Sequence, residues 1–215
     1  MESRVEVWTL GSGRAAEVPA GVLVRKCATR DFGRVVRREM DPRPEAAPRG
    51  AWGWIRQDGA PPLERVLEAW SGAVVDLELA TWPGAFTAAD ARRIVEAGAS
   101  GVTSHGYSVP RHSAGIRVLA EAGLVAYPQI YRPSRPTLTA AKFAQVAMRD
   151  WGRDGFAPGR VCPLVAASDR AYALEVGASA LREGAAGVGL WGWTSSPSRS
   201  TRDLLTRLHR LAYPT

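Results

Sequence analysis

Cysteine and histidine are scarce in this chain. Cys27 and Cys162 are its only cysteines, and each lies in an apolar, strand-like run. A disulfide framework needs more cysteines in a smaller chain, so we expect two free, buried thiols. The three histidines are dispersed, and we expect no metal site. If the chain were a metal-dependent hydrolase instead, His105 and His112 with Asp76 would be the candidate ligands.

Long hydrophobic runs are also missing. The first residues, Met1-Glu2-Ser3-Arg4-Val5, lack the apolar core of a signal peptide. No apolar run approaches the length of a membrane span. We therefore expect synthesis in the cytoplasm without a membrane span. Association with a virion or release by lysis would be the routes out of the cell.

Lysine is nearly absent, so arginine supplies almost all of the positive charge. Only Lys26 and Lys142 occur, and 28 Lys and Arg against 21 Asp and Glu give a net charge of +7. The excess is scattered, with local clusters within 34–38 and 199–210. A solvated surface is the simpler interpretation, and weak attraction to anionic polymers is the alternative. No zinc-finger spacing or RNA-binding signature occurs, so nucleic acid is not an expected partner.

Eight strand-like segments alternate with helical patterns along the chain. The expected strands are Val5–Leu10, Gly21–Cys27, Ala51–Arg56, Ala73–Ala80, Gly101–Tyr107, Leu124–Tyr131, Arg160–Ala167 and Gly187–Trp193. The expected amphipathic helices are Leu63–Trp70, Thr87–Ala97, His112–Ala122, Leu138–Trp151, Arg170–Glu183 and Thr201–Leu211. Alternation of strands and helices indicates a parallel sheet, and eight such units indicate a closed (β/α)8 barrel.

We expect one compact α/β domain of the TIM-barrel type over residues 1–215. Its first βα units are reduced, because Gly11–Ala20 contains Gly, Ser, Pro and charges rather than a helical pattern, and Asp41–Gly50 is a Pro-rich loop. An open doubly wound sheet is the alternative. Gly11-Ser12-Gly13 argues against it, since the third glycine of a phosphate-binding fingerprint is missing. No cofactor is expected.

The segment Ala73–Ala80 carries the most informative pattern, because two acids occur in an apolar strand. Alternate side chains of a strand share a face, so Asp76 and Glu78 point one way while Val75 and Leu77 point the other. Buried acids are costly unless they are paired, hydrogen-bonded or used in chemistry. Barrel enzymes place their chemistry at the C-terminal ends of the strands, so we expect both acids at the barrel mouth.

Aromatic and polar side chains gather at the equivalent ends of other strands. The candidate substrate-binding residues are Trp54, Trp82, Tyr107, Tyr127, Gln129, Tyr131, Trp191 and Trp193. Aromatic faces suit the apolar C–H surface of sugar rings, and carboxylates supply acid–base chemistry for glycosidic cleavage. A single aromatic residue is more often part of a core. Their convergence at one end of one barrel favours the functional interpretation.

These residues resemble a known group of barrels. The segment Val74–Glu78 resembles the Asp-x-Glu signature of the lysozyme-type muramidases of glycoside hydrolase family 25, and the tail of the longer chitinase signature of family 18. Ala126–Tyr131 and Trp191–Trp193 are similar to strand ends in family-25-like barrels of bacterial and phage proteins. The resemblance implies that Glu78 is the general acid. It implies that Asp76 stabilises the substrate's acetamido group or the developing cation.

The chain also departs from these families. Family 25 enzymes usually carry an Asp on the first strand, where only Glu6 occurs, and an Asp on the sixth, where Gln129 stands. The acid that family 18 requires before Asp76 is missing from Gly72–Val75. Two hypotheses remain. One is a hydrolase of N-acetylated cell-wall glycan, peptidoglycan or chitin-like. The other is a non-catalytic barrel that binds glycan or protein partners as a component of a phage tail or injection-type particle.

Overall fold

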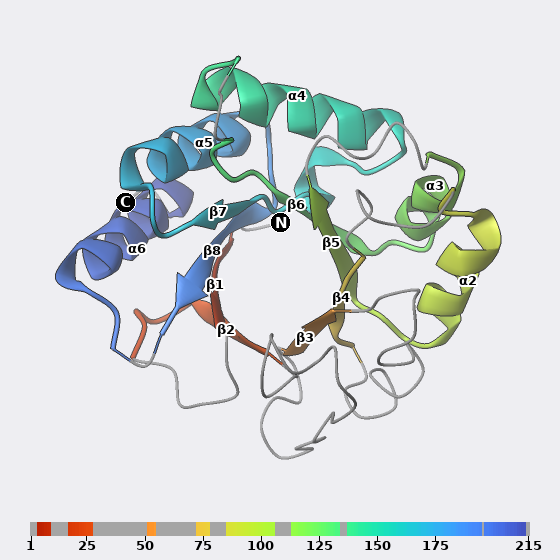
Figure 1. Ribbon diagram of the computed structural model, residues 1–215, viewed down its shortest axis with the longest axis horizontal. Helices are drawn as coiled ribbons and strands as arrows, with labels where there is room; N and C mark the ends of the chain where they lie inside the picture. Colours follow the sequence, from red (N-terminus) through yellow and green to blue (C-terminus); the bar gives the residue numbers. More distant parts are fainter. Residues whose placement is uncertain are drawn as a thin grey trace.

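The computed structural model describes residues 4–9, 17–27, 51–54, 72–77, 85–105, 113–133, 137–194 and 196–213. The side chains at positions 4, 26–27, 51–54, 105 and 113 are outside that description. Within it, eight parallel strands close into a barrel (Figure 1). They are β1 (Arg4–Thr9), β2 (Leu23–Cys27), β3 (Ala51–Trp54), β4 (Val74–Asp76), β5 (Gly101–His105), β6 (Val125–Gln129), β7 (Leu164–Ala166) and β8 (Gly187–Trp193). The predicted (β/α)8 barrel is confirmed.

The described helices lie outside the ring of strands, along part of its circumference. They are α2 (Ala88–Glu96), α3 (Ser113–Glu121), α4 (Ala140–Arg153), α5 (Arg170–Arg182) and α6 (Arg199–Ala212), with a short 3-10 helix, η4 (Pro158–Arg160). Figure 1 shows them as an arc from α2 to α6, and α6 contacts both β8 and β1. These five α-helices agree with the sequence patterns, whereas η4 was not predicted. The helix expected at Leu63–Trp70 lies outside the described residues.

The helices begin where a side chain satisfies the first backbone N–H groups. Thr87 and Asp90 form a reciprocal capping box at α2, in which each side chain accepts a hydrogen bond from the other residue's backbone N–H. Thr139, Asp169 and Ser198 accept the corresponding bond at α4, α5 and α6. Before β2, residues 17–22 form no helix, as the sequence predicted for that connection.

The core has an outer and an inner layer, set by alternation along each strand. Val75 on β4 packs outward with α2 and α3, and Val188 on β8 packs outward with α5 and α6. The inner layer is a separate cluster made of Trp8, Val74, Tyr127, Cys162, Leu164 and Ala186. Cys162 is a buried cysteine that forms no disulfide, in agreement with the prediction, and the side chain of Cys27 is outside the described residues. The barrel interior is therefore a packed core, as is typical of this fold.

The alternation of β8 changes at Gly192. Trp191 lies opposite Trp8 on β1, but the next residue of β1, Thr9, lies opposite Trp193. Gly192 is thus an extra residue, with a φ of +88° in the left-handed region that favours glycine. As a result Trp191 packs against the inner cluster, whereas Trp193 packs in the outer layer.

Candidate functional site

Asp76 ends β4 and points into the barrel. Its sequence neighbours Val75 and Leu77 belong to the outer core, and Val74 belongs to the inner cluster. The Asp76 side chain therefore lies on the inner face, at the carboxyl end of its strand. It is only 1% exposed. A carboxyl group at this depth needs polar neighbours.

Gln129 supplies a polar contact to Asp76, and Thr103 contacts the same Gln129 amide. Gln129 on β6 places its Nε2 3.3 Å from Oδ1 and 3.4 Å from Oδ2 of Asp76. The same nitrogen is 3.3 Å from Oγ1 of Thr103 on β5, which donates to the Tyr127 carbonyl over 2.7 Å. Strand register brings these residues together, since Asp76 lies opposite Thr103, and Thr103 opposite Tyr127. Three adjacent strands thus build one connected polar group.

A buried ion pair lies on the other side of the barrel interior. The Nε of Arg25 on β2 donates to Oε2 of Glu6 on β1, and its Nη2 donates to Oε1 over 3.1 Å. Nη2 also donates to the Tyr127 hydroxyl over 2.7 Å. The guanidinium lies 5.7 Å from the Trp8 ring centroid, within range of a cation–π contact. Burial alone would lower the pKa of Arg25, but the Glu6 carboxylate, together with Tyr127 and Cys162, outweighs burial and raises that pKa above its ordinary value.

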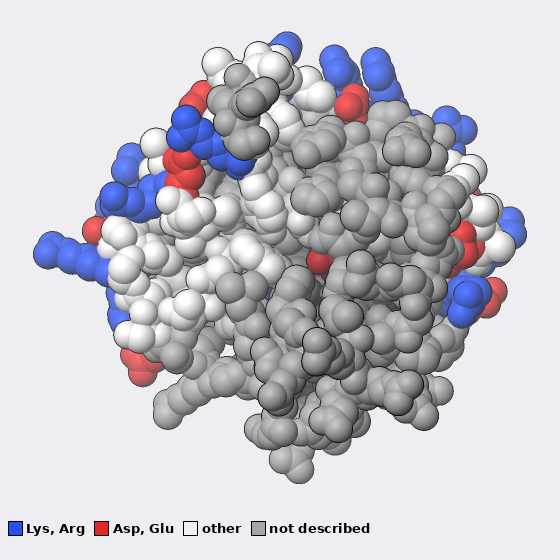
Figure 2. Space-filling model, in the orientation of Figure 1, with Lys and Arg blue, Asp and Glu red and all other residues white. Residues whose placement is uncertain are grey.

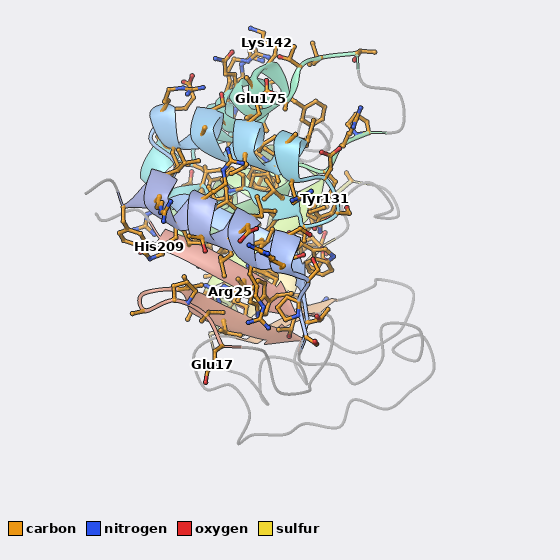
Figure 3. The ribbon with its side chains drawn as sticks, turned by 90° about the vertical axis from the view of Figure 1, so that its left-hand side faces the viewer. Glu17, Arg25, Tyr131, Lys142, Glu175 and His209 are labelled. Carbon is orange, nitrogen blue, oxygen red and sulfur yellow. The ribbon has the colours of Figure 1, made fainter. Side chains whose placement is uncertain are left out.

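Tyr131 and Trp191 form the partly buried aromatic pair of this region. Their ring centroids are 6.5 Å apart, and Trp191 also lies 6.2 Å from Trp8. In Figure 3, Arg25 lies among the strands, Tyr131 toward one end of the barrel and His209 toward the other. His209 is near the C-terminus of α6, and helices of a barrel run opposite to the strands. Tyr131 is therefore at the carboxyl end of the strands.

The structure separates the other predicted site residues. Tyr127 is 1% exposed and belongs to the inner cluster, and Trp193 is 1% exposed in the outer layer. Trp54 lies opposite Asp76 in the β3–β4 register, but its side chain is outside the description. Glu78, Trp82 and Tyr107 lie outside the described residues altogether.

Sequence reasoning missed three interior polar residues, Glu6, Arg25 and Thr103. Each occupies a position whose alternation along an apolar strand points inward, which is the signal that was used for Asp76. The sequence could have predicted the Glu6–Arg25 ion pair. The two side chains have opposite charges and point into the same barrel interior from adjacent strands. Thr103 gives a weaker signal, since threonine is common in strands.

Metal and membrane sites have no support in the described part of the chain. There, no group of three or more His, Cys, Asp and Glu side chains could hold a metal ion. Nor is any described helix both long and apolar enough to cross a bilayer. On the face shown in Figure 2, the coloured Lys and Arg side chains lie around the periphery, over the helices. That distribution suits a solvated surface.

Known proteins share the architecture of this chain. Comparisons with protein-family models and with curated proteins found no match. Among solved structures, a candidate chitinase A from Streptomyces coelicolor has a TM-score of 0.59 and 12% identity, covering 96% of this chain and 98% of that one. The carboxyl transferase domain of Rhizobium etli pyruvate carboxylase has a TM-score of 0.50 and 13% identity, covering 99% of this chain and 47% of that one.

A third similar structure is a dihydropteroate synthase from Xanthomonas albilineans. Its TM-score is 0.46 and its identity 14%, with 100% of this chain and 95% of that one covered. The likeness to the chitinase and carboxyl transferase structures, at 12% and 13% identity, concerns the fold and not the activity. The eight closed parallel strands and the neighbouring chitinase-like structure place the chain among the TIM barrels.

Proposed function

We propose that the chain is a glycosidase-like barrel that acts on N-acetylated cell-wall glycan, peptidoglycan or a chitin-like polymer. In this proposal Glu78 is the general acid and Asp76 the stabilising carboxylate. The observation that carries it is the position of Asp76, which points inward at the carboxyl end of β4 with an amide donor beside it. Barrel enzymes place catalytic groups at these strand ends.

Two further observations support the proposal. The segment Val74–Glu78 resembles the Asp-x-Glu signature of glycoside hydrolase family 25 and the end of the family 18 signature. The candidate chitinase A has the same type of barrel over 96% of this chain. Neither observation identifies the glycan, so the proposal is limited to polymers whose sugars carry an N-acetyl group.

The proposed reaction begins with proton transfer from Glu78 to the leaving glycosidic oxygen. The bond from that oxygen to the anomeric carbon breaks, and positive charge develops on the sugar ring. The substrate's own N-acetyl oxygen then attacks the anomeric carbon. Water next attacks the same carbon, the bond to the acetyl oxygen breaks, and the water gives a proton back to Glu78. We prefer this route to attack by Asp76, because carboxyls at positions i and i+2 of one strand lie side by side rather than across a sugar ring. Asp76 orients and stabilises the acetamido group.

The aromatic residues divide between glycan contact and packing. Tyr131 and Trp191 are partly exposed near the strand ends, so we assign their ring faces to sugar binding. Trp54, Trp82 and Tyr107 stay in the proposed binding site on the grounds of sequence. Tyr127 and Trp193 are left out because each is only 1% exposed, which leaves no ring face for a sugar.

The test is release of reducing sugar from purified peptidoglycan and from chito-oligosaccharides. We expect the wild-type protein to cleave one of them and Glu78→Gln to lower kcat about 10²-fold or more. Glu96→Gln, on an exposed position of α2, is the matched control and is expected to keep wild-type activity. Unchanged cleavage by Glu78→Gln would remove Glu78 from the mechanism.

The second candidate is a barrel that binds glycan or a particle partner without cutting it. The observation that favours it is Gln129, an amide at the strand position where family 25 enzymes usually carry an acid. On this hypothesis wild-type protein releases no reducing sugar but sediments with insoluble glycan. Trp191→Ala would then reduce the bound fraction, and Glu78→Gln would leave it unchanged.

A further inference from the structure

We infer that Thr103 and Gln129 form a positioning pair that keeps the Asp76 carboxylate ionised. Asp76 then only accepts hydrogen bonds and does not compete with the general acid as a proton donor. The catalytic meaning of this inference rests on the proposed function. The charge state of Asp76, however, can be measured without any substrate, so the two ideas can fail separately.

The direction of the hydrogen bonds begins at the Tyr127 backbone. The Oγ1 of Thr103 lies 2.7 Å from the Tyr127 carbonyl oxygen. A carbonyl oxygen only accepts, so the single hydroxyl proton of Thr103 lies between these two atoms. Toward every other neighbour the Thr103 oxygen is therefore an acceptor.

This constraint fixes the orientation of the Gln129 amide. The amide group has one face that donates, NH₂, and one that accepts, the carbonyl oxygen. Because the Thr103 oxygen can only accept from Gln129, the NH₂ group must be the one that lies 3.3 Å from it. The same Nε2 lies 3.3 and 3.4 Å from the two Asp76 oxygens. Asp76 thus faces a donor.

A donor at this position favours one charge state of Asp76. Hydrogen bonds donated to a carboxylate stabilise its ionised form. Thr103, Asp76 and Gln129 are 0%, 1% and 6% exposed, so solvent water competes little with these bonds. An acid at position 129 would have the opposite effect, since two facing carboxyls share a proton. With the Gln129 amide beside it, Asp76 therefore stays ionised and does not act as a proton donor.

Other charged groups in the barrel stay constant in the test. The inward-facing titratable side chains that the structure describes are Glu6 on β1, Arg25 on β2, Tyr127 on β6 and Cys162 before β7. His105 lies opposite Gln129 in the β5–β6 register, and Glu78 follows Asp76 by two residues; both side chains are outside the description. Thr103→Val keeps all six groups and removes one hydroxyl.

The first measurement is ¹³C NMR titration of the side-chain carboxyls in the full chain, with the Asp76 signal assigned by its loss in Asp76→Asn. We expect Asp76 to protonate at a higher pH in Thr103→Val and Gln129→Glu than in wild type, by about one pH unit. Thr103→Ser keeps a hydroxyl and is expected to titrate like wild type. A Thr103→Val titration equal to wild type, or a Thr103→Ser titration equal to Thr103→Val, would overturn the inference.

The second measurement is the pH dependence of kcat and KM on the cleaved glycan. We expect Thr103→Val to shift the acidic limb of kcat upward in pH and Thr103→Ser to restore it, with KM nearly unchanged. If wild type cleaves nothing, the proposed function fails and the NMR titration still decides the charge state of Asp76. If circular dichroism shows Thr103→Val to be unfolded, the titration of Gln129→Glu decides it instead.

Discussion

Arg25 on β2 holds both carboxylate oxygens of Glu6 on β1 inside the barrel. The two side chains are 5% and 0% exposed, and Arg25 also donates to the Tyr127 hydroxyl. Removing two charges from water is costly, and their attraction offsets that cost only while both partners are present. The pair therefore links β1, β2 and β6 in a way that depends on both side chains.

Breaking this pair from one side should destabilise the protein strongly. We expect Glu6→Gln or Arg25→Met to lower the free energy of unfolding by about 3–5 kcal/mol, because each leaves an uncompensated polar group or charge in the core. The double variant should lose clearly less unfolding free energy than the two single variants lose together. Urea denaturation of all four proteins gives the coupling energy directly.

A surface ion pair provides the control for that cycle. Arg132 binds Asp169 over 2.8 Å with side chains 59% and 28% exposed. Exposed pairs contribute about 0–1 kcal/mol, so Arg132→Met should have a small effect. Equal losses for Arg132→Met and Arg25→Met would show that burial of the interior pair has no energetic consequence.

Asp169 should stabilise α5 in a pH-dependent way. Hydrogen bonds from Arg132 and from the Tyr172 backbone N–H lower the pKa of Asp169 below its ordinary value of 3.8. The contribution of its charge is present above pH 3.8 and is lost as pH falls through the lower folded-state value. We expect Asp169→Ala to cost about 1 kcal/mol at pH 7, and Asp169→Asn less. If wild type and Asp169→Ala differed in unfolding free energy by the same amount at pH 2 and at pH 7, this assignment would be contradicted.

Asp154 should show the opposite pH dependence. Burial raises the pKa of this carboxyl, Arg117 opposes the rise and Asp150 adds to it. The ionised form is therefore penalised in the folded state, and stability falls as pH rises from 3.8 through the raised value. Asp154→Asn is expected to be more stable than wild type at pH 7 and to lose this advantage near pH 3. Thermal unfolding at both pH values measures the difference, and a variant less stable at pH 7 would refute it.

Two glycines give contrasting tests of packing. A Cβ at Gly189 would overlap Leu164 Cδ2 and lie 3.1 Å from Trp8 Nε1, whereas at Gly152 in α4 nothing lies within 4 Å. We expect Gly189→Ala to cost about 1–3 kcal/mol by overpacking the barrel interior. Gly152→Ala should gain up to about 1 kcal/mol because alanine is the better helix former. Urea denaturation separates the two, and a tolerated Gly189→Ala would mean that the inner cluster is loosely packed.

The barrel could be predicted because its signals are local and repeated. Period-two alternation in eight apolar segments, and caps such as Thr87 with Asp90, specify strands and helices without any tertiary information. The contacts of the candidate site depend on register instead. Neither Gln129 nor Thr103 identifies its partner in the sequence, because β4, β5 and β6 come together only when the barrel closes.

The faces of the two tryptophans of β8 could not be predicted from the sequence either. Strict alternation predicts that Trp191 and Trp193 share a face, and one extra residue places them on opposite faces. A bulge of this kind is set by a single backbone conformation rather than by a hydrophobic pattern. Sequence periodicity therefore assigned Trp191 and Trp193 to one surface.

Because of the bulge at Gly192, the two tryptophans of β8 lie in different layers. Trp193 packs under the outer helices, and Trp191 lies at the end of the barrel interior. If residue 192 took a regular strand conformation without the bulge, Trp193 would be the i+2 neighbour of Trp191 and would turn inward, whereas deleting Gly192 would leave Trp193 outward, opposite Thr9. The left-handed conformation of this single residue thus decides whether one indole or two face the inner cluster.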